Sequence, residues 1–158
     1  MKKLLIISSL FWIPFLSYAQ NDSPQDLEAH FSAIVVNDFD SSINWYSKIL
    51  GFKVVSRIES VERGFKQSNL KRGDVLIELI ELDRAVNLED IVPNYNSQMR
   101  IIGLFKIGFL VTDFEKWINH LTNEKVDFYG QIVTDNTSGK RMVIITDPDG
   151  NRIQIFEK

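Results

Sequence analysis

The side chains that most often carry out chemistry in proteins are scarce in this sequence. It contains no cysteine and only two histidines, His30 and His120. Without cysteine the chain can form neither a disulfide framework nor the cysteine-linked lipid anchor of a lipoprotein. His120 falls in a segment with helical spacing, where packing or solvent exposure is the expected role, and His30 directly precedes an apolar, strand-like segment. Any chemistry therefore depends on carboxylates, amides and amines, and on the elements that bring them together.

The N-terminus has the layout of a secretory signal. Lys2 and Lys3 precede an apolar run over residues 4–16, and Ser17-Tyr18-Ala19 places small residues at the first and third positions before a cut after Ala19. The apolar run is shorter than the roughly 20 residues that span a bilayer. We therefore predict a signal peptide at 1–19, a flexible leader at 20–28, and an exported protein that is periplasmic or extracellular.

Length and charge exclude several classes of partner. Removing residues 1–19 leaves a mature chain over 20–158, which is long enough for one domain with a sizeable core. That cut leaves 16 basic against 21 acidic side chains, a net charge near −5. An acidic chain without a Lys/Arg cluster lacks the electrostatic footprint of nucleic-acid or anionic-membrane binding. We predict no nucleic-acid partner and, after signal cleavage, no membrane partner.

The chain contains an internal repeat. VVNDFDSSINWY begins at position 35 and recurs as LVTDFEKWINHL from position 110, while LIELIE begins at position 76 and recurs as RIQIFE from position 152. The offsets of these two pairs differ by a single position. Two independent stretches with nearly one offset indicate a duplicated half-domain.

Each copy has the pattern of one strand, one helix and three further strands. Apolar alternation predicts the strands. The first helix opens around Ser41-Ser42, where Asp or Ser can cap it, and ends at Gly51. The predicted fold class is α+β, a single domain over 29–158 made of two βαβββ halves, 29–82 and 104–158, joined by a partly helical linker over 83–103. The expected strands are 31–36, 52–59, 63–69, 75–82, 104–111, 128–134, 141–146 and 151–157, and the second helix is 114–123.

Three segments resemble the vicinal oxygen chelate superfamily, which includes glyoxalases, extradiol dioxygenases, methylmalonyl-CoA epimerase and bleomycin resistance proteins. They are NDFDSSINWYSKILGFKVV, VTDFEKW and the terminal DPDGNRIQIFEK. The resemblance implies that the mixed sheets of two tandem βαβββ half-domains form a cup-shaped cleft. It also implies, in the family's enzymes, a divalent metal held by the first and fourth strands of each half. A homodimer is a further analogy that the family offers.

Carried over to this sequence, the family's ligand positions fall on Phe31, Lys106, Glu78 and Gln154. A phenyl ring has no donor atom, and an ammonium group repels a divalent cation. The carboxylate and the amide that remain are too few for a catalytic metal, which needs at least three protein ligands. We therefore predict no bound metal and no other cofactor.

Strand alternation extends these positions into a mostly apolar cleft that suits a small-molecule ligand. Glu78 and Lys106 lie in this predicted cleft, and two roles are open to them. They are either a polar anchor or acid/base pair for the ligand, or a structural ion pair in place of the metal. The predicted lining comprises Phe31, Ala33, Val35, Glu78, Ile80, Lys106, Leu110, Gln154 and Phe156.

Three functions compete at this stage. The leading hypothesis is a binding module that holds a small molecule in its cleft without metal-dependent catalysis, similar in logic to bleomycin resistance proteins. The second is a metal-dependent lyase, isomerase or dioxygenase of the glyoxalase superfamily with an altered centre. The third is a protein-interaction module whose cup is a filled core. An open cavity favours the first, a cluster of donors the second and a packed interior the third.

Overall fold

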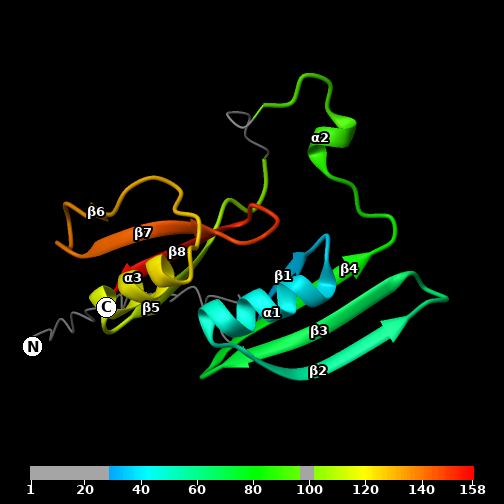
Figure 1. Cartoon of the computed structure of the whole chain (residues 1–158), viewed down its shortest axis with the longest axis horizontal. Helices are drawn as coiled ribbons and strands as arrows, with labels where there is room; N and C mark the ends of the chain where they lie inside the picture. Colours follow the sequence, from blue (N-terminus) through cyan, green and yellow to red (C-terminus); the bar gives the residue numbers. More distant parts are fainter. Residues whose placement is uncertain (1–28, 97–101) are drawn as a thin grey trace, which may run out of the picture.

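The computed structural model describes residues 29–96 and 102–158; the predicted signal peptide and the predicted leader, residues 1–28, lie outside this range. It contains two halves of like architecture, each with one helix against a four-stranded sheet (Figure 1). The first half comprises β1 (Ser32–Val35), α1 (Phe39–Leu50), β2 (Lys53–Ser60), β3 (Phe65–Arg72) and β4 (Val75–Leu82). The second comprises β5 (Ile107–Val111), α3 (Phe114–Asn123), β6 (Val133–Thr134), β7 (Arg141–Thr146) and β8 (Arg152–Glu157), and the linker holds the short α2 (Leu88–Ile91).

Both sheets are mixed and have the same topology. The strand orders are β1-β4-β3-β2 and β5-β8-β7-β6, with β1 parallel to β4, β5 parallel to β8 and the other neighbours antiparallel. The α+β class and the two βαβββ half-domains expected from the sequence are therefore confirmed.

Strand register shows that the repeat is structural. Ala33 on β1 lies opposite Glu78 on β4, and Gly108 on β5 lies opposite Gln154 on β8. Ala33 corresponds to Gly108, and Glu78 to Gln154, with the same two offsets that separate the repeated sequence segments. Each half consequently presents equivalent residues at equivalent places in its sheet.

The two long helices begin at equivalent aspartates. The Asp38 carboxylate accepts the Ser41 N–H at 2.9 Å, and the Asp113 carboxylate accepts the Lys116 N–H at 3.0 Å. Both bonds satisfy a backbone donor that the first helical turn leaves free. Of the two residue types that the sequence allowed as a cap, Asp or Ser, the structure uses Asp38, so α1 begins at Phe39 and includes the serine pair.

None of the helices in the described part of the chain is long and apolar enough to cross a membrane.

Two expected strands are shorter than the sequence pattern indicated. The strand predicted over 128–134 reduces to an isolated bridge from Phe128 to Ile145 and the short β6. Gly130 lies between them with φ 92°, a conformation that breaks an extended strand. The strand predicted from residue 104 begins at Ile107, so Lys106 directly precedes β5, as Phe31 directly precedes β1.

One hydrophobic core runs through both halves. The ring centroids of Phe52 and Phe109, one from each half, lie 5.9 Å apart. His120 on α3 places its Nε2 2.9 Å from the Ile49 carbonyl oxygen on α1, so this histidine packs between the halves as expected. The fully buried side chains of the core include Val36, Phe39, Tyr46, Leu50, Leu70, Ile77, Leu79, Phe114, Leu121, Ile145, Ile153 and Ile155.

A buried polar contact also joins the halves. Tyr46 on α1 is 0% exposed, and its hydroxyl donates to the carboxylate of Asp147, 2.8 Å away, at the start of the β7–β8 turn. Asp147 also accepts from the Asp149 and Asn151 backbone N–H groups and from the Asn151 side-chain amide. Burial and the Asp147 charge raise the pKa of the Tyr46 hydroxyl above its ordinary value, so the hydroxyl remains a donor.

Candidate ligand-binding site

The predicted cleft residues lie on the sheet faces that point away from the core. On β4, Ile77 and Leu79 are 1% and 0% exposed, whereas Glu78 and Ile80 between and beside them are only half-buried. The same alternation on β8 buries Ile153 and Ile155 and leaves their neighbours half-buried. We call this side of the two sheets the inner face; it carries Ala33, Val35, Glu78 and Ile80 in the first half and Leu110, Gln154 and Phe156 in the second, with Phe31 and Lys106 just before the first strands.

The inner face is accessible to solvent. Val35 is 49% exposed, Phe31 53% and Leu110 65%. Large apolar side chains at these fractions are not part of a filled interior. The face is therefore a surface on which an apolar ligand can lie.

The ion pair between Lys106 and Glu78, one of the two interpretations of these residues, does not form within the described ranges. Glu78 instead accepts a hydrogen bond from the Gln67 amide of the neighbouring β3. The Lys106 Nζ lies 5.8 Å from the centroid of the Phe105 ring. The two residues belong to different sheets, and each finds a partner closer to its own strand.

The four family ligand positions do not fit a divalent metal ion. Phe31 contributes a ring, Lys106 an ammonium group, and Gln154 directs its amide to the Met142 sulfur. Within residues 29–96 and 102–158, no group of three His, Cys, Asp or Glu side chains could hold such an ion. His30 does not replace the missing donor, since its ring packs edge-on against Phe31, 5.5 Å away.

Residues of both halves meet in a cavity of about 270 Å³ beside β1 and the start of β5. We call it the seam pocket. Of the predicted cleft residues, the structure brings Ala33, Val35 and Lys106 together here, and it leaves Glu78, Ile80, Gln154, Phe156, Leu110 and Phe31 outside this cavity. The full lining is Ala33, Ile34, Val35, Leu104, Phe105, Lys106, Ile107, Asn151 and Arg152.

Two cations, Lys106 and Arg152, and the Phe105 ring line one side of the seam pocket, and the Tyr129 ring contacts Arg152 from outside the lining. The Arg152 guanidinium carbon lies 4.7 Å from the centroid of Phe105 and 4.1 Å from that of Tyr129. Lys106 lies over the same Phe105 ring. Cation–π contacts of this kind hold a positive group in place without neutralising it.

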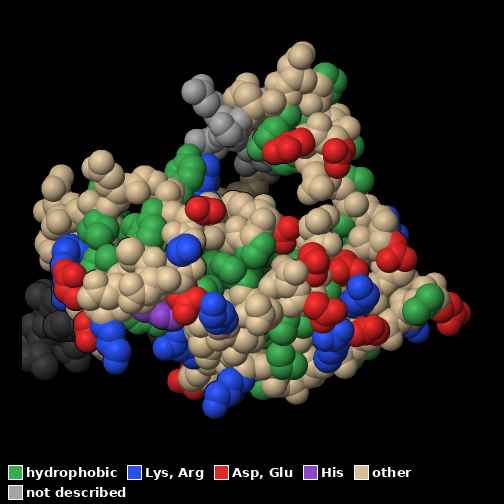
Figure 2. Space-filling model, viewed as in Figure 1, with side chains coloured by type: hydrophobic (Ala, Val, Ile, Leu, Met, Phe, Trp, Pro, Cys, Tyr) green, Lys and Arg blue, Asp and Glu red, His purple; other side chains and the backbone are tan. Residues whose placement is uncertain are grey.

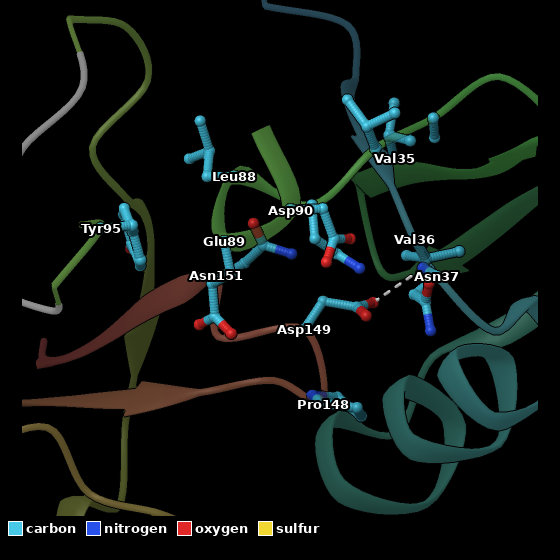
Figure 3. Close-up of a pocket in the computed structure, with 13 residues that line it drawn as sticks. Val35, Val36, Asn37, Leu88, Glu89, Asp90, Tyr95, Pro148, Asp149 and Asn151 are labelled. Carbon is cyan, nitrogen blue, oxygen red and sulfur yellow. Dashed lines mark hydrogen bonds between the residues drawn. The ribbon is translucent and has the colours of Figure 1, made fainter. Parts of the chain in front are cut away.

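A larger cavity of about 520 Å³ adjoins the seam pocket, and the two share Val35 and Asn151. We call it the linker pocket; it lies under the arch of chain that carries α2 (Figure 2), and Figure 3 shows its lining. Its acidic residues are Glu89, Asp90 and Asp149. Burial raises the pKa of the Asp149 carboxyl, with the nearby Asp147 charge acting in the same direction.

Sequence patterns missed several residues of these pockets. Arg152 is not among them, because strand alternation already places it, two positions before Gln154, on the same face of β8. Phe105 and Tyr129 fall within segments predicted as strands, but the structure leaves both outside β5 and β6, so strand alternation could not place their rings. The linker acids Glu89 and Asp90 also gave no motif, because only the path of the linker brings them beside β1.

Comparisons with known proteins agree with this fold. A family model, Glyoxalase/Bleomycin resistance protein/Dioxygenase superfamily, matches residues 29–155. The chain is 27% identical over 130 residues to the uncharacterized protein YwkD of Bacillus subtilis strain 168, covering 82% of this chain and 95% of YwkD. It is 27% identical over 132 residues to the uncharacterized protein YaeR of Escherichia coli strain K12, covering 83% of this chain and 96% of YaeR.

A solved structure supports the same assignment. The crystal structure of the glyoxalase family protein from Enterococcus faecalis superposes with a TM-score of 0.69 at 26% identity, covering 82% of this chain and 97% of that chain. Its likeness and the family model extend over both βαβββ halves. The chain therefore belongs to the Glyoxalase/Bleomycin resistance protein/Dioxygenase superfamily.

Proposed function

We propose that this protein binds a small organic molecule in the seam pocket, with a metal site that has lost its donors and without metal-dependent catalysis. The observation that carries the proposal is that inner-face residues of both halves, Ala33, Val35 and Lys106, line one cavity. An apolar concavity with a few polar groups is the usual form of a small-molecule site. The name of the family fits this proposal, because it includes bleomycin resistance proteins beside enzymes.

The alternatives fit the residues less well. A metal-dependent lyase, isomerase or dioxygenase needs donors at Phe31 and Lys106, which supply none to a divalent cation. A protein-interaction module with a filled cup needs a packed inner face, but Val35 and Leu110 keep about half or more of their side-chain surface exposed.

The proposal is tested by adding a mixture of small neutral aromatic fragments to the protein and following the chemical shifts of its backbone amides. We expect saturable shifts that cluster around residues 33–35 and 104–107. Val35→Glu should weaken fragment binding about tenfold or more, because it places a charge in the apolar wall. Val61→Glu is the matched control, since Val61 is 98% exposed in the β2–β3 turn. Equal binding by both variants, or shifts scattered over the surface, would count against a site at the seam.

The proposal includes export, which rests on the predicted signal at residues 1–19. The mature protein isolated from a bacterial host should begin at or within a few residues of Gln20. Its N-terminal sequence and its recovery from the periplasm or medium provide the measurement. Intact Met1 on a membrane-bound form would contradict export, and the proposed binding site would be unaffected.

A further inference from the structure

We infer that the ligand of the seam pocket is an organic oxyanion, held at its charged end by Lys106 and Arg152. This inference rests on the proposed function and assigns a chemical class to the ligand of that same site. The resemblance to the family implies a divalent cation at its ligand positions, but Phe31 and Lys106 offer no donor to one.

The first step is the unneutralised charge of the two cations. Among the residues that the structure describes, neither Lys106 nor Arg152 has a carboxylate within ion-pair distance, whereas Arg57, Lys66 and Arg141 each have at least one. Both side chains are half-buried in the wall of a cavity and do not extend fully into water. A cation in such a place attracts an anion more strongly than one on an open surface does, because solvent screens it less.

The second step is the orientation of Arg152. Its guanidinium carbon lies over the Phe105 and Tyr129 rings, 4.7 and 4.1 Å from their centroids. A contact with a ring uses up none of the N–H donors of a guanidinium, and no acceptor among the described residues takes a hydrogen bond from those of Arg152. Two parallel N–H groups match the two oxygens of a carboxylate or phosphate. The rings therefore preorganise the arginine for an oxyanion.

The third step is the position of the charges in the fold. Lys106 occupies the family's first-strand ligand position, and Arg152 lies two positions before the fourth-strand ligand position, Gln154, on the same face of β8. The two singly charged side chains thus lie beside the positions at which the resemblance implies a divalent metal ion in the family's enzymes. An oxyanion can be bound here by the side chains alone.

The walls of the two pockets orient such a ligand. Ala33, Val35 and Leu104 give the seam pocket an apolar side against which an aromatic or aliphatic body can pack. Glu89 and Asp90 in the adjoining linker pocket repel an anion (Figure 3). The anionic end therefore points to Lys106 and Arg152, away from the linker acids.

Titration of the purified protein with three probes of the same ring tests this inference: benzoate, phenyl phosphate and benzyl alcohol. At low ionic strength we expect at least one oxyanion to bind about tenfold or more tightly than the alcohol. The preference between benzoate and phenyl phosphate distinguishes a carboxylate from a phosphate ligand. Added salt should weaken the oxyanion and leave the alcohol unchanged, because only the former binds through charge.

Substitutions of the two cations test whether they are the residues that bind the oxyanion. Lys106→Gln and Arg152→Gln should each weaken oxyanion binding about tenfold and leave benzyl alcohol binding unchanged. Lys53→Gln and Arg84→Gln remove exposed cations elsewhere and serve as matched controls. If Arg152→Gln disturbs the fold through its two rings, Lys106→Gln still gives the answer, because within the described ranges the Lys106 ammonium group lies over a single ring, that of Phe105.

The outcomes separate the inference from the proposed function. Equal affinity for benzoate, phenyl phosphate and benzyl alcohol at the seam overturns the oxyanion inference and leaves the proposed binding site standing. Oxyanion binding that survives both substitutions overturns it as well. If no probe, charged or neutral, binds at the seam, both proposals are wrong.

Discussion

Replacing Phe31 and Lys106 together by His is expected to create a divalent-metal site on the inner face of this protein. The two imidazoles would join Glu78 and Gln154, so that four donors come from the equivalent positions of the two halves. A metal at a hundredfold excess over its dissociation constant stabilises the folded state by about 2.7 kcal/mol. For a domain of this size that corresponds to a rise in Tm of about 10 °C with Zn²⁺ or Ni²⁺.

Matched variants show whether the rise in Tm comes from metal bound by residues of the inner face. Thermal unfolding of the double variant with and without metal should show the rise, and adding Glu78→Ala to it should remove most of the effect. Lys53→His, an exposed control, should leave the metal response unchanged. The unsubstituted protein should show no rise. A rise in that protein, abolished by Glu78→Ala, would contradict the proposed loss of the metal site and support the enzyme hypothesis.

Asp147→Ala is expected to lower the free energy of unfolding by about 3 kcal/mol or more. The substitution leaves the fully buried Tyr46 hydroxyl without its acceptor, and an unsatisfied buried group costs about 1–3 kcal/mol. It also removes the acceptor of three N–H donors in the β7–β8 turn. Chemical denaturation measures the change. Asp149→Ala, in the same turn, is the control and should cost less, because Asp149 is only partly buried and accepts one backbone N–H, that of Asn37.

A double-mutant cycle isolates the contact between the halves. Tyr46→Phe alone should cost about 1 kcal/mol, since Asp147 keeps its turn donors. In the Asp147→Ala background the same change should cost less, or even stabilise, because it removes the orphaned hydroxyl. Strictly additive effects would show that the bond does not couple the halves.

The repeat made most of the fold predictable from the sequence. Asp38 and Asp113 are local signals, because a carboxylate before a helix caps it whatever surrounds it. The alternation around Glu78 and Gln154 is local too, since successive side chains of a strand point to opposite faces. The predicted length was wrong for strands whose ends are set by the neighbouring strand with which they pair. The segment over 128–134 has strand-like residues, yet Gly130 turns it away from β7 and pairing survives at only a few of them.

By itself, then, the sequence determined the two halves, their inner faces and the residue types at positions 31 and 106, because these depend on residue type and on spacing within one element. The tertiary structure decided which of those residues meet. It paired Glu78 with Gln67 rather than Lys106, and it placed Lys106 and Arg152 against the Phe105 ring beside Val35. The seam pocket joins β1, near the start of the first half, to segments of the second half that are distant in the chain. Only the docking of one half on the other sets this arrangement, and no local periodicity encodes that geometry.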